Sequence, residues 1–140
     1  MTNPKPVAGY SSRPLAQKLG IKAHQRIAVL QAPADYAALV APLPEGVSQV
    51  ADLAEGLDFV HFFTASHAEL SDQFPRLKAA IRKNGMIWIS WPKKAAKLPT
   101  DLDENIIREL GLALGLVDVK VAAIDPTWSG LKFVYRTVDR

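Results

Sequence analysis

Two apolar segments separated by an amphipathic one constrain the fold of this chain more than any other feature. Leu57–Phe63 (LDFVHFF) and Met86–Trp91 (MIWISW) are apolar with little alternation, which is the pattern of strands buried on both faces. Between them, apolar residues recur at spacings of four, three and four, as on one face of a helix: Leu70, Phe74, Leu77 and Ile81. We expect this helix to be capped by Ser66, to run to about Lys83 and to end at Asn84–Gly85. Such a unit joins two parallel neighbours of a sheet by a right-handed crossover.

The remaining elements continue this alternation of strands and helices. Before the central unit we expect a short helix capped by Ser11 or Ser12 and ended by Gly20, a strand at Ile27–Leu30, a short helix that begins at Gln31–Pro33 and ends before Pro42 or Pro44, and a weak strand within Val47–Leu53. After it we expect a helix capped by Thr100 or Asp101, with a stripe of Leu102, Ile106, Leu110 and Leu114, and then strands at Val117–Ala123 and Leu131–Val138. In the strand Val117–Ala123, Asp118 and Lys120 alternate with valines, as on one wetter face. A short turn at Pro126–Gly130 makes the last two strands antiparallel.

This order predicts an α/β fold. We expect a three-layer Rossmann-like sandwich whose sheet is mostly parallel and closes with a C-terminal antiparallel hairpin. The length of 140 residues suits one domain, predicted at residues 10–140 after a flexible lead-in at residues 1–9. The strand Val117–Ala123 is a candidate sheet edge, which makes a homodimer through that edge conceivable.

Composition excludes several classes of protein. Without cysteine there is no disulfide framework, thiolate metal site or catalytic thiol. No apolar run reaches the length of about 20 residues that a bilayer requires, and the N-terminus has no secretory pattern, so we expect a cytoplasmic protein that does not enter membranes. His24, His61 and His67 lack the spacing of metal ligands, and His61 suits a hydrogen-bonded core position. The net charge of +3 is interspersed along the chain, which makes nucleic acid an improbable partner.

Two stretches resemble class I methyltransferases. They are Asp58–Phe63 with the helix and strand that follow, through the turn Arg82–Gly85 to Trp91, and the closing strands Val117–Asp125 and Ser129–Val138. Together with Ile27–Leu30 this resemblance covers most of the chain, and it implies a Rossmann-like sheet that binds S-adenosylmethionine.

The sequence departs from that family where the cofactor binds. Family members carry a glycine-rich turn after the first strand, because glycine lets the backbone approach the cofactor closely. Here the turn is Gln31–Tyr36, without glycine. The acidic residue expected after the second strand is Asp52 or Glu55, and one strand–helix unit is missing between Leu39 and Leu57, so the fold is predicted to be shortened. We therefore expect no cofactor.

A second resemblance covers nearly the whole chain. Gly9-Tyr10-Ser11, the strand end Ser90–Lys94 (SWPKK) and Asp125–Lys132 (DPTWSGLK) resemble the signatures of a bacterial domain family to which no activity is assigned. This resemblance implies a shared fold and conveys no reaction.

Candidate ligand-binding residues lie where the parallel strands end, because open α/β sheets bind ligands beyond the carboxyl ends of their strands. They are Gln31, Pro33, Thr64, Ser66, His67, Trp91, Lys93 and Lys94. Trp91 beside the lysines could hold an anion and stack on a ring, and the alternative, which we favour, is a solvated loop whose tryptophan plugs the sheet. The cluster from Asp125 to Ser129 is better explained as an Asx turn than as a site. We assign no catalytic or metal-binding residue.

Three functions follow from these observations. The sequence favours a non-catalytic, methyltransferase-like domain that binds a protein partner or a small anionic ligand, and is more consistent with a binding protein than with an enzyme. The alternative is an S-adenosylmethionine-dependent transferase with an atypical cofactor loop at Gln31–Tyr36. Weak nucleic-acid association through the basic residues of the long helix and of the loop after Trp91 ranks last.

Overall fold

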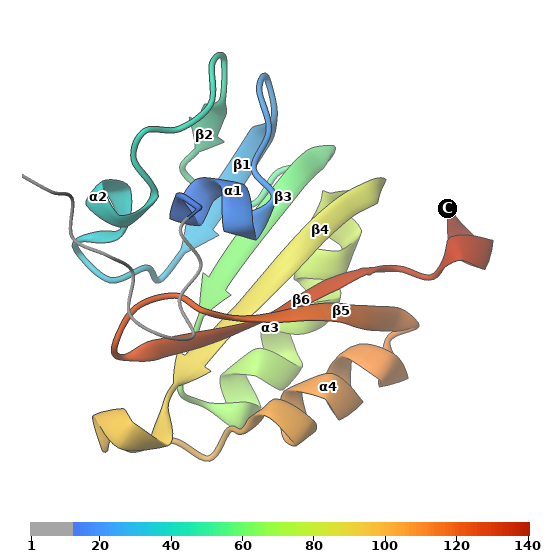
Figure 1. Ribbon diagram of the computed structural model, residues 1–140. Coiled ribbons are helices and arrows are strands. Elements are labelled where there is room, and N and C mark those ends of the chain that lie inside the picture. Colours follow the sequence, from blue (N-terminus) through green and yellow to red (C-terminus); the bar gives the residue numbers. More distant parts are fainter. Residues whose placement is uncertain (1–12) are drawn as a thin grey trace, which may run out of the picture.

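The structure is a computed structural model that describes residues 13–140. Predictions that fall on residues 1–12, including the lead-in and the Gly9-Tyr10-Ser11 signature, lie outside the described residues. The predicted cap of the first helix at Ser11 or Ser12 is wrong, because that helix begins at Leu15 and its N-cap is Pro14, which has no side-chain hydrogen bond to offer. The described chain forms a six-stranded sheet in the order β2-β1-β3-β4-β6-β5 (Figure 1). Its strands are β1 Arg26–Leu30, β2 Ser48–Val50, β3 Leu57–Phe63, β4 Ile81–Pro92, β5 Leu116–Ala123 and β6 Trp128–Tyr135. The first four are parallel, and β6 runs antiparallel to both β4 and β5, which confirms the predicted fold class.

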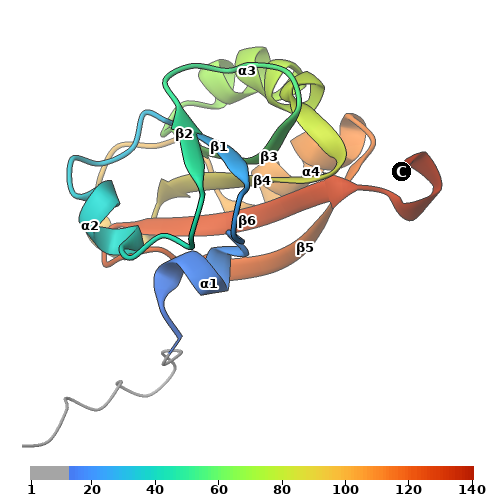
Figure 2. The same cartoon turned by 90° about the horizontal axis from the view of Figure 1, so that it is seen from above.

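Helices cover both faces of this sheet and complete three layers (Figure 2). The short helices α1 (Leu15–Leu19) and α2 (Tyr36–Val40) lie on one face, and α3 (His67–Ala80) and α4 (Glu104–Ala113) lie on the other. Short 3-10 turns follow β4 at Lys94–Ala96 and β6 at Thr137–Asp139.

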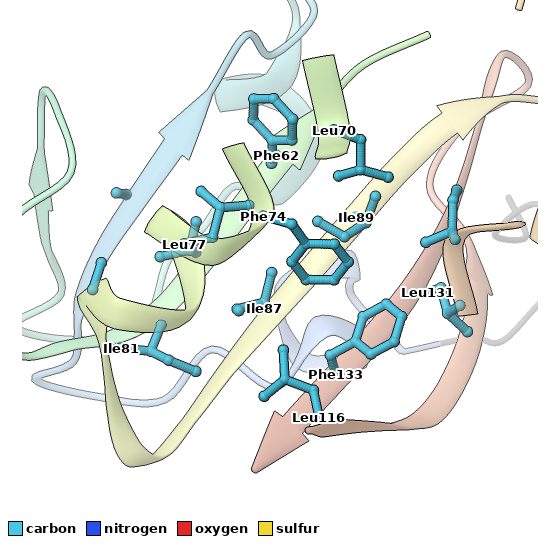
Figure 3. Close-up of a cluster of buried hydrophobic side chains, with 14 of the residues drawn as sticks. Phe62, Leu70, Phe74, Leu77, Ile81, Ile87, Ile89, Leu116, Leu131 and Phe133 are labelled. Carbon is cyan, nitrogen blue, oxygen red and sulfur yellow. The ribbon is translucent and has the colours of Figure 1, made fainter. Parts of the chain in front are cut away.

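The larger core lies between the sheet and the pair α3 and α4 (Figure 3). The predicted helix stripe is buried here, with Leu70, Phe74 and Leu77 from α3 packed on Ile87 and Ile89 of β4. On the opposite face, α1 is tied to the sheet by a hydrogen bond of 2.8 Å from Trp88 Nε1 to the carbonyl of Leu19. The two buried clusters hold the sheet from both sides, as a mostly parallel sheet requires.

Two helix boundaries differ from the prediction. The helix expected to reach Lys83 ends at Ala80, and Ile81 already begins β4, so Asn84–Gly85 lies within the strand rather than at a helix end. The N-cap of α4 is Asp103, which accepts a hydrogen bond of 2.8 Å from the backbone N–H of Ile106. Neither Thr100 nor Asp101 fills that role, because their side chains bond to the segment around the start of α3.

The face assignment in β5 also differs from the prediction. The alternation in sequence predicts Asp118 and Lys120 on the same wetter face, but a register shift between them interrupts it. Asp118 lies opposite Phe133 and pairs with Arg108 of α4, at 2.8 Å between Nε and Oδ2. Lys120 lies opposite Lys132 and turns toward α1, where its Nζ donates to the carbonyl of Lys18. A single irregularity therefore places the two charges on opposite faces of the sheet.

The chain is shortened between β2 and β3, as the sequence predicted. β2 has only three residues, and the connection at residues 51–56 contains no helix. No strand–helix unit lies between β2 and β3, and Arg76 of α3 is exposed beside Leu53 on this side of the sheet.

Candidate functional site

The described strands reverse their order of connection at β1 and β3. From β1 the chain passes through α2 to β2 on one side, and from β3 it passes through α3 to β4 on the other. The carboxyl ends of strands at such a switch point form the usual ligand crevice of open α/β sheets. A pocket of about 340 Å³ lies there. It is lined by Leu30, Gln31, Asp52, Leu53, Phe62, Glu69, Gln73 and Arg76.

Gln31 follows β1 directly and has a left-handed backbone, with φ of 58°. This region disfavours residues with a Cβ, and glycine enters it without cost. The turn after β1 thus takes a left-handed conformation, although glutamine stands at this position. The Gln31 amide Nε2 donates to the carbonyl of Phe63 at 2.8 Å and to Oε1 of Glu69 at 3.0 Å. Its side chain therefore bridges the ends of β1 and β3.

Glu69 is hydrogen-bonded to three of the predicted site residues. Its Oε1 accepts from Gln31 and also from the hydroxyl of Thr64, at 2.5 Å. Ser66 caps α3 by accepting a bond of 3.1 Å from the Glu69 N–H, and the Ser66 N–H donates to Thr64 Oγ1. We did not predict Glu69. The pattern Ser66-x-x-Glu69 is a capping box, and that signal would have placed Glu69 at the start of the helix beside Ser66.

Two charged side chains complete the pocket. Asp52 follows β2 and is exposed, in the position where the methyltransferase resemblance led us to expect an acid. Arg76 projects from α3 on the other wall. A second hollow of about 310 Å³ shares Leu53 and Arg76 with the first and continues past Glu55. The two together form a groove between α3 and the segment after β2, beside the place of the missing unit.

The other predicted site residues lie apart from this pocket. Pro33 does not line it, and its carbonyl accepts the N–H of Tyr36 within the turn into α2. The His67 N–H donates to Asp101 Oδ1 at 2.7 Å. Trp91 is buried at 7% exposure among the core residues beneath α3 and α4, in keeping with the plug interpretation.

The lysines after β4 also do not join the switch point. Lys94 is exposed in its 3-10 turn. The Lys93 N–H donates to the carbonyl of Thr127, and Lys93 lines a separate pocket of about 310 Å³ together with Lys18 and Asp125. At the neighbouring turn, Asp125 Oδ1 accepts from the N–H groups of Thr127 and Trp128, which confirms the Asx turn.

His61 is a buried core residue, as predicted. Its Nδ1 lies 2.8 Å from Tyr36 Oη, and its Nε2 lies 2.8 Å from Ser90 Oγ. Burial lowers the pKa of His61 to about 3 and raises that of Tyr36 above its ordinary value. This network lies on the α1 and α2 side of the sheet, beneath the switch point. Within residues 13–140, no three His, Cys, Asp or Glu side chains come together as metal ligands.

Comparison with known proteins bears on the fold. No family model and no curated protein matches the sequence. Solved structures do match. Fibrillarin from Aeropyrum pernix with natively bound S-adenosyl-L-methionine has a TM-score of 0.56 at 16% identity, over 86% of this chain and 73% of that one. Magnesium protoporphyrin IX methyltransferase from Synechocystis with bound S-adenosylhomocysteine has a TM-score of 0.52 at 11% identity, over 87% and 78%. A possible exported protein from Bordetella parapertussis has a TM-score of 0.60 at 11% identity, over 88% and 66%.

These similarities show a methyltransferase-like fold. They also overturn our expectation of no cofactor, because proteins of this fold are seen with S-adenosylmethionine or S-adenosylhomocysteine bound. The expectation rested on the missing glycine after the first strand. In the structure the backbone of Gln31 makes a left-handed turn without glycine, and an open pocket lies beside it.

Among residues 13–140, no helix has the length and apolar character to cross a bilayer.

Proposed function

We propose that this protein is an S-adenosylmethionine-dependent transferase with an atypical cofactor loop, and that the cofactor occupies the pocket at the ends of β1 and β2. One observation supports the proposal above all. Gln31, whose backbone makes a left-handed turn, and the carboxylate-bearing Asp52 both line the same pocket of about 340 Å³. That volume falls within the range of small-ligand sites, which is about 300 to 1,000 Å³.

The residues present suit the chemical groups of S-adenosylmethionine. The Asp52 carboxylate is an acceptor for ribose hydroxyls, and the Arg76 guanidinium is a donor for the carboxylate of the amino-acid end. The apolar side chains of Leu53 and Phe62 offer a surface for the adenine ring. When bound, the cofactor supplies an activated methyl group. The protein's part is to hold the cofactor and to orient that methyl group.

Titration calorimetry with S-adenosylmethionine and S-adenosylhomocysteine tests this proposal. We expect Asp52→Asn to weaken binding by about 10- to 150-fold, because a hydrogen bond to a charged group is worth about 1.5 to 3 kcal/mol. Glu109→Gln removes one negative charge from the exposed side of α4, away from the pocket, and should leave the affinity unchanged. An absence of heat at millimolar ligand, or equal weakening by both substitutions, would refute the proposal.

Gln31→Gly examines the atypical loop itself. Glycine keeps the left-handed turn and removes the side chain that bridges to Phe63 and Glu69. We expect tighter cofactor binding in this variant, since the mouth of the pocket is then open.

Methyl transfer itself is measured as radiolabelled methyl incorporated into the RNA, protein and small-molecule fractions of a cell extract. Asp52→Asn should reduce that incorporation in proportion to its loss of affinity.

A second function, a non-catalytic domain that binds a small anionic ligand, is favoured by a different pocket. Lys18 and Lys93 line a hollow of about 310 Å³ between α1, the end of β4 and the β5–β6 turn. Asp125 also lines it, and its Oδ1 accepts the N–H groups of Thr127 and Trp128. Two ammonium groups at one concave site suit a phosphate or carboxylate ligand. A thermal shift with phosphate or citrate that Lys93→Gln abolishes would support this function, and no shift at millimolar ligand would exclude it.

A further inference from the structure

Two lysines face each other across the closing hairpin. Lys120 of β5 and Lys132 of β6 are direct cross-strand partners, and both reach the C-terminal end of α1. Lys120 Nζ donates to the carbonyl of Lys18 at 2.8 Å. Lys132 Nζ lies 3.5 Å from the position that a Cβ on Gly20 would take. This placement results from the register shift in β5, which turns Lys120 away from the side of Asp118.

Within residues 13–140, no Asp or Glu side chain forms a salt bridge with either lysine. The charged groups that act on Lys120 are Arg13 and Lys18, and those that act on Lys132 are Lys120 and Lys22. Burial, and then these cations, lower the pKa of both lysines. Within residues 13–140, Lys132 Nζ has no hydrogen-bond or salt-bridge partner. Residues 1–12 contain no Asp or Glu.

Further cations lie near the pair. Lys132 lines a small hollow of about 170 Å³ with Arg140, beside Asn84 and Gly85. We call the whole set the cationic row, and its members are Arg13, Lys18, Lys22, Lys120, Lys132 and Arg140.

Stability does not explain the cationic row. Like charges directly opposite each other on a sheet destabilise it, and half-buried ammonium groups add to that cost. The arrangement does suit an anion that approaches from outside. A row suits a repeating anion better than a single one, because each phosphate of a polymer can meet a different cation.

We propose that the cationic row binds the phosphodiester backbone of a polynucleotide, with Lys132 at the centre of the contact. The small hollow beside Lys132 and Arg140 has room for one phosphate group. This inference does not depend on the proposed transferase activity. It runs against our expectation that nucleic acid is an improbable partner, which was based on charges interspersed along the sequence. The cationic row draws on four separate segments of the chain, and only the fold brings them together.

Fluorescence anisotropy with a labelled single-stranded RNA of about 20 nucleotides, at about 50 mM salt and without S-adenosylmethionine, tests this inference. Variants are Lys132→Gln and the double variant Lys120→Gln/Lys132→Gln. The matched control is Lys83→Gln, which removes the same charge on the opposite face, where Lys83 lies over the Tyr135 ring. We expect the double variant to lose at least about tenfold in affinity, and the slope of log affinity against log salt to fall by about one for each lysine removed.

Thermal unfolding of the same variants separates a binding role from a structural one. Lys132→Gln relieves the repulsion from Lys120, so its midpoint should equal or exceed that of the unmodified protein. A lower midpoint would show that Lys132 serves the fold and would overturn the inference. Three other results would also overturn the inference. They are equal RNA affinity in Lys132→Gln and Lys83→Gln, no binding to RNA at about 50 mM salt, and tighter binding to phosphatidylserine vesicles than to RNA.

Discussion

The hydroxyl of Tyr36 in α2 and the imidazole of His61 in β3 are joined by a buried hydrogen bond of 2.8 Å between Oη and Nδ1. The other ring nitrogen of His61 is 2.8 Å from Ser90 Oγ in β4. These three side chains form a hydrogen-bonded chain, which we call the relay, and it links helix α2 to the neighbouring strands β3 and β4. Every polar atom in it has a partner, and the relay therefore fixes α2 on the sheet directly below the switch point.

Removal of the Tyr36 hydroxyl should destabilise the protein. In Tyr36→Phe, His61 Nδ1 stays buried without a partner, which costs about 1 to 3 kcal/mol of unfolding free energy. Urea denaturation measures this loss. Tyr135→Phe is the control, because its hydroxyl bonds to the Lys78 carbonyl in a partly exposed position and its loss should cost about 1 kcal/mol or less. Equal losses in the two variants would contradict the role given to the relay.

The low pKa of His61 should make stability depend on pH. Folding depresses its pKa to about 3 from the ordinary value of 6.5, so the unfolded state binds more protons between those values. The stabilising contribution is complete above pH 6.5 and is lost as the pH falls toward 3, at up to about 1.4 kcal/mol for each pH unit. Urea denaturation from pH 7 to pH 4 gives the slope. His61→Phe should show a shallower one, and an unchanged slope would refute the assignment.

Gly111 of α4 is required by close packing on Phe133. A Cβ at Gly111 would fall 2.2 Å from Cε1 of that ring, so Gly111→Ala must displace it. We expect a loss of about 1 to 3 kcal/mol, although alanine favours helix by about 1 kcal/mol over glycine. Phe133→Leu in the same chain makes room, and the double variant should be more stable than the sum of the single losses predicts. Strict additivity would argue against the steric explanation.

Trp91 and Lys94 were predicted as members of one site, and their substitutions should differ sharply. Trp91→Ala empties a buried position and should cost about 3 to 5 kcal/mol. Lys94→Ala changes an exposed turn and should stay within about 0.5 kcal/mol of the unmodified protein. Chemical denaturation measures both. A small loss in Trp91→Ala would restore the interpretation of this tryptophan as a ligand surface.

Local patterns were sufficient for most of the fold. Leu57–Phe63 is the strand that its unbroken apolar run predicts, and Phe74 lies on the buried face that its helical spacing predicts. Both signals arise within one element. The face of Lys120 could not be predicted in this way, because a register shift beside Asp118 interrupts the period of two.

The candidate site could be predicted only in part. Gln31, Thr64 and Ser66 follow from the rule that ligands bind where strands end, and the structure brings them together around Glu69. Arg76 could not be found in that way, because it comes from the second half of a helix. Arg76 lines the pocket because no strand–helix unit lies between β2 and β3 to cover it. No pattern within α3 itself predicts that this side of the helix borders a pocket.

The bond from Trp88 Nε1 to the carbonyl of Leu19 has a consequence for synthesis on the ribosome. The helix α1 is synthesised before the indole that anchors it, which lies 69 positions later in the chain. Residues are added at about 5 to 20 per second, so α1 waits for several seconds before its anchor emerges. The lysine of β5 that bonds to Lys18 arrives later still. Among the described elements, α1 is therefore one of the last to dock, although it precedes all the others in sequence.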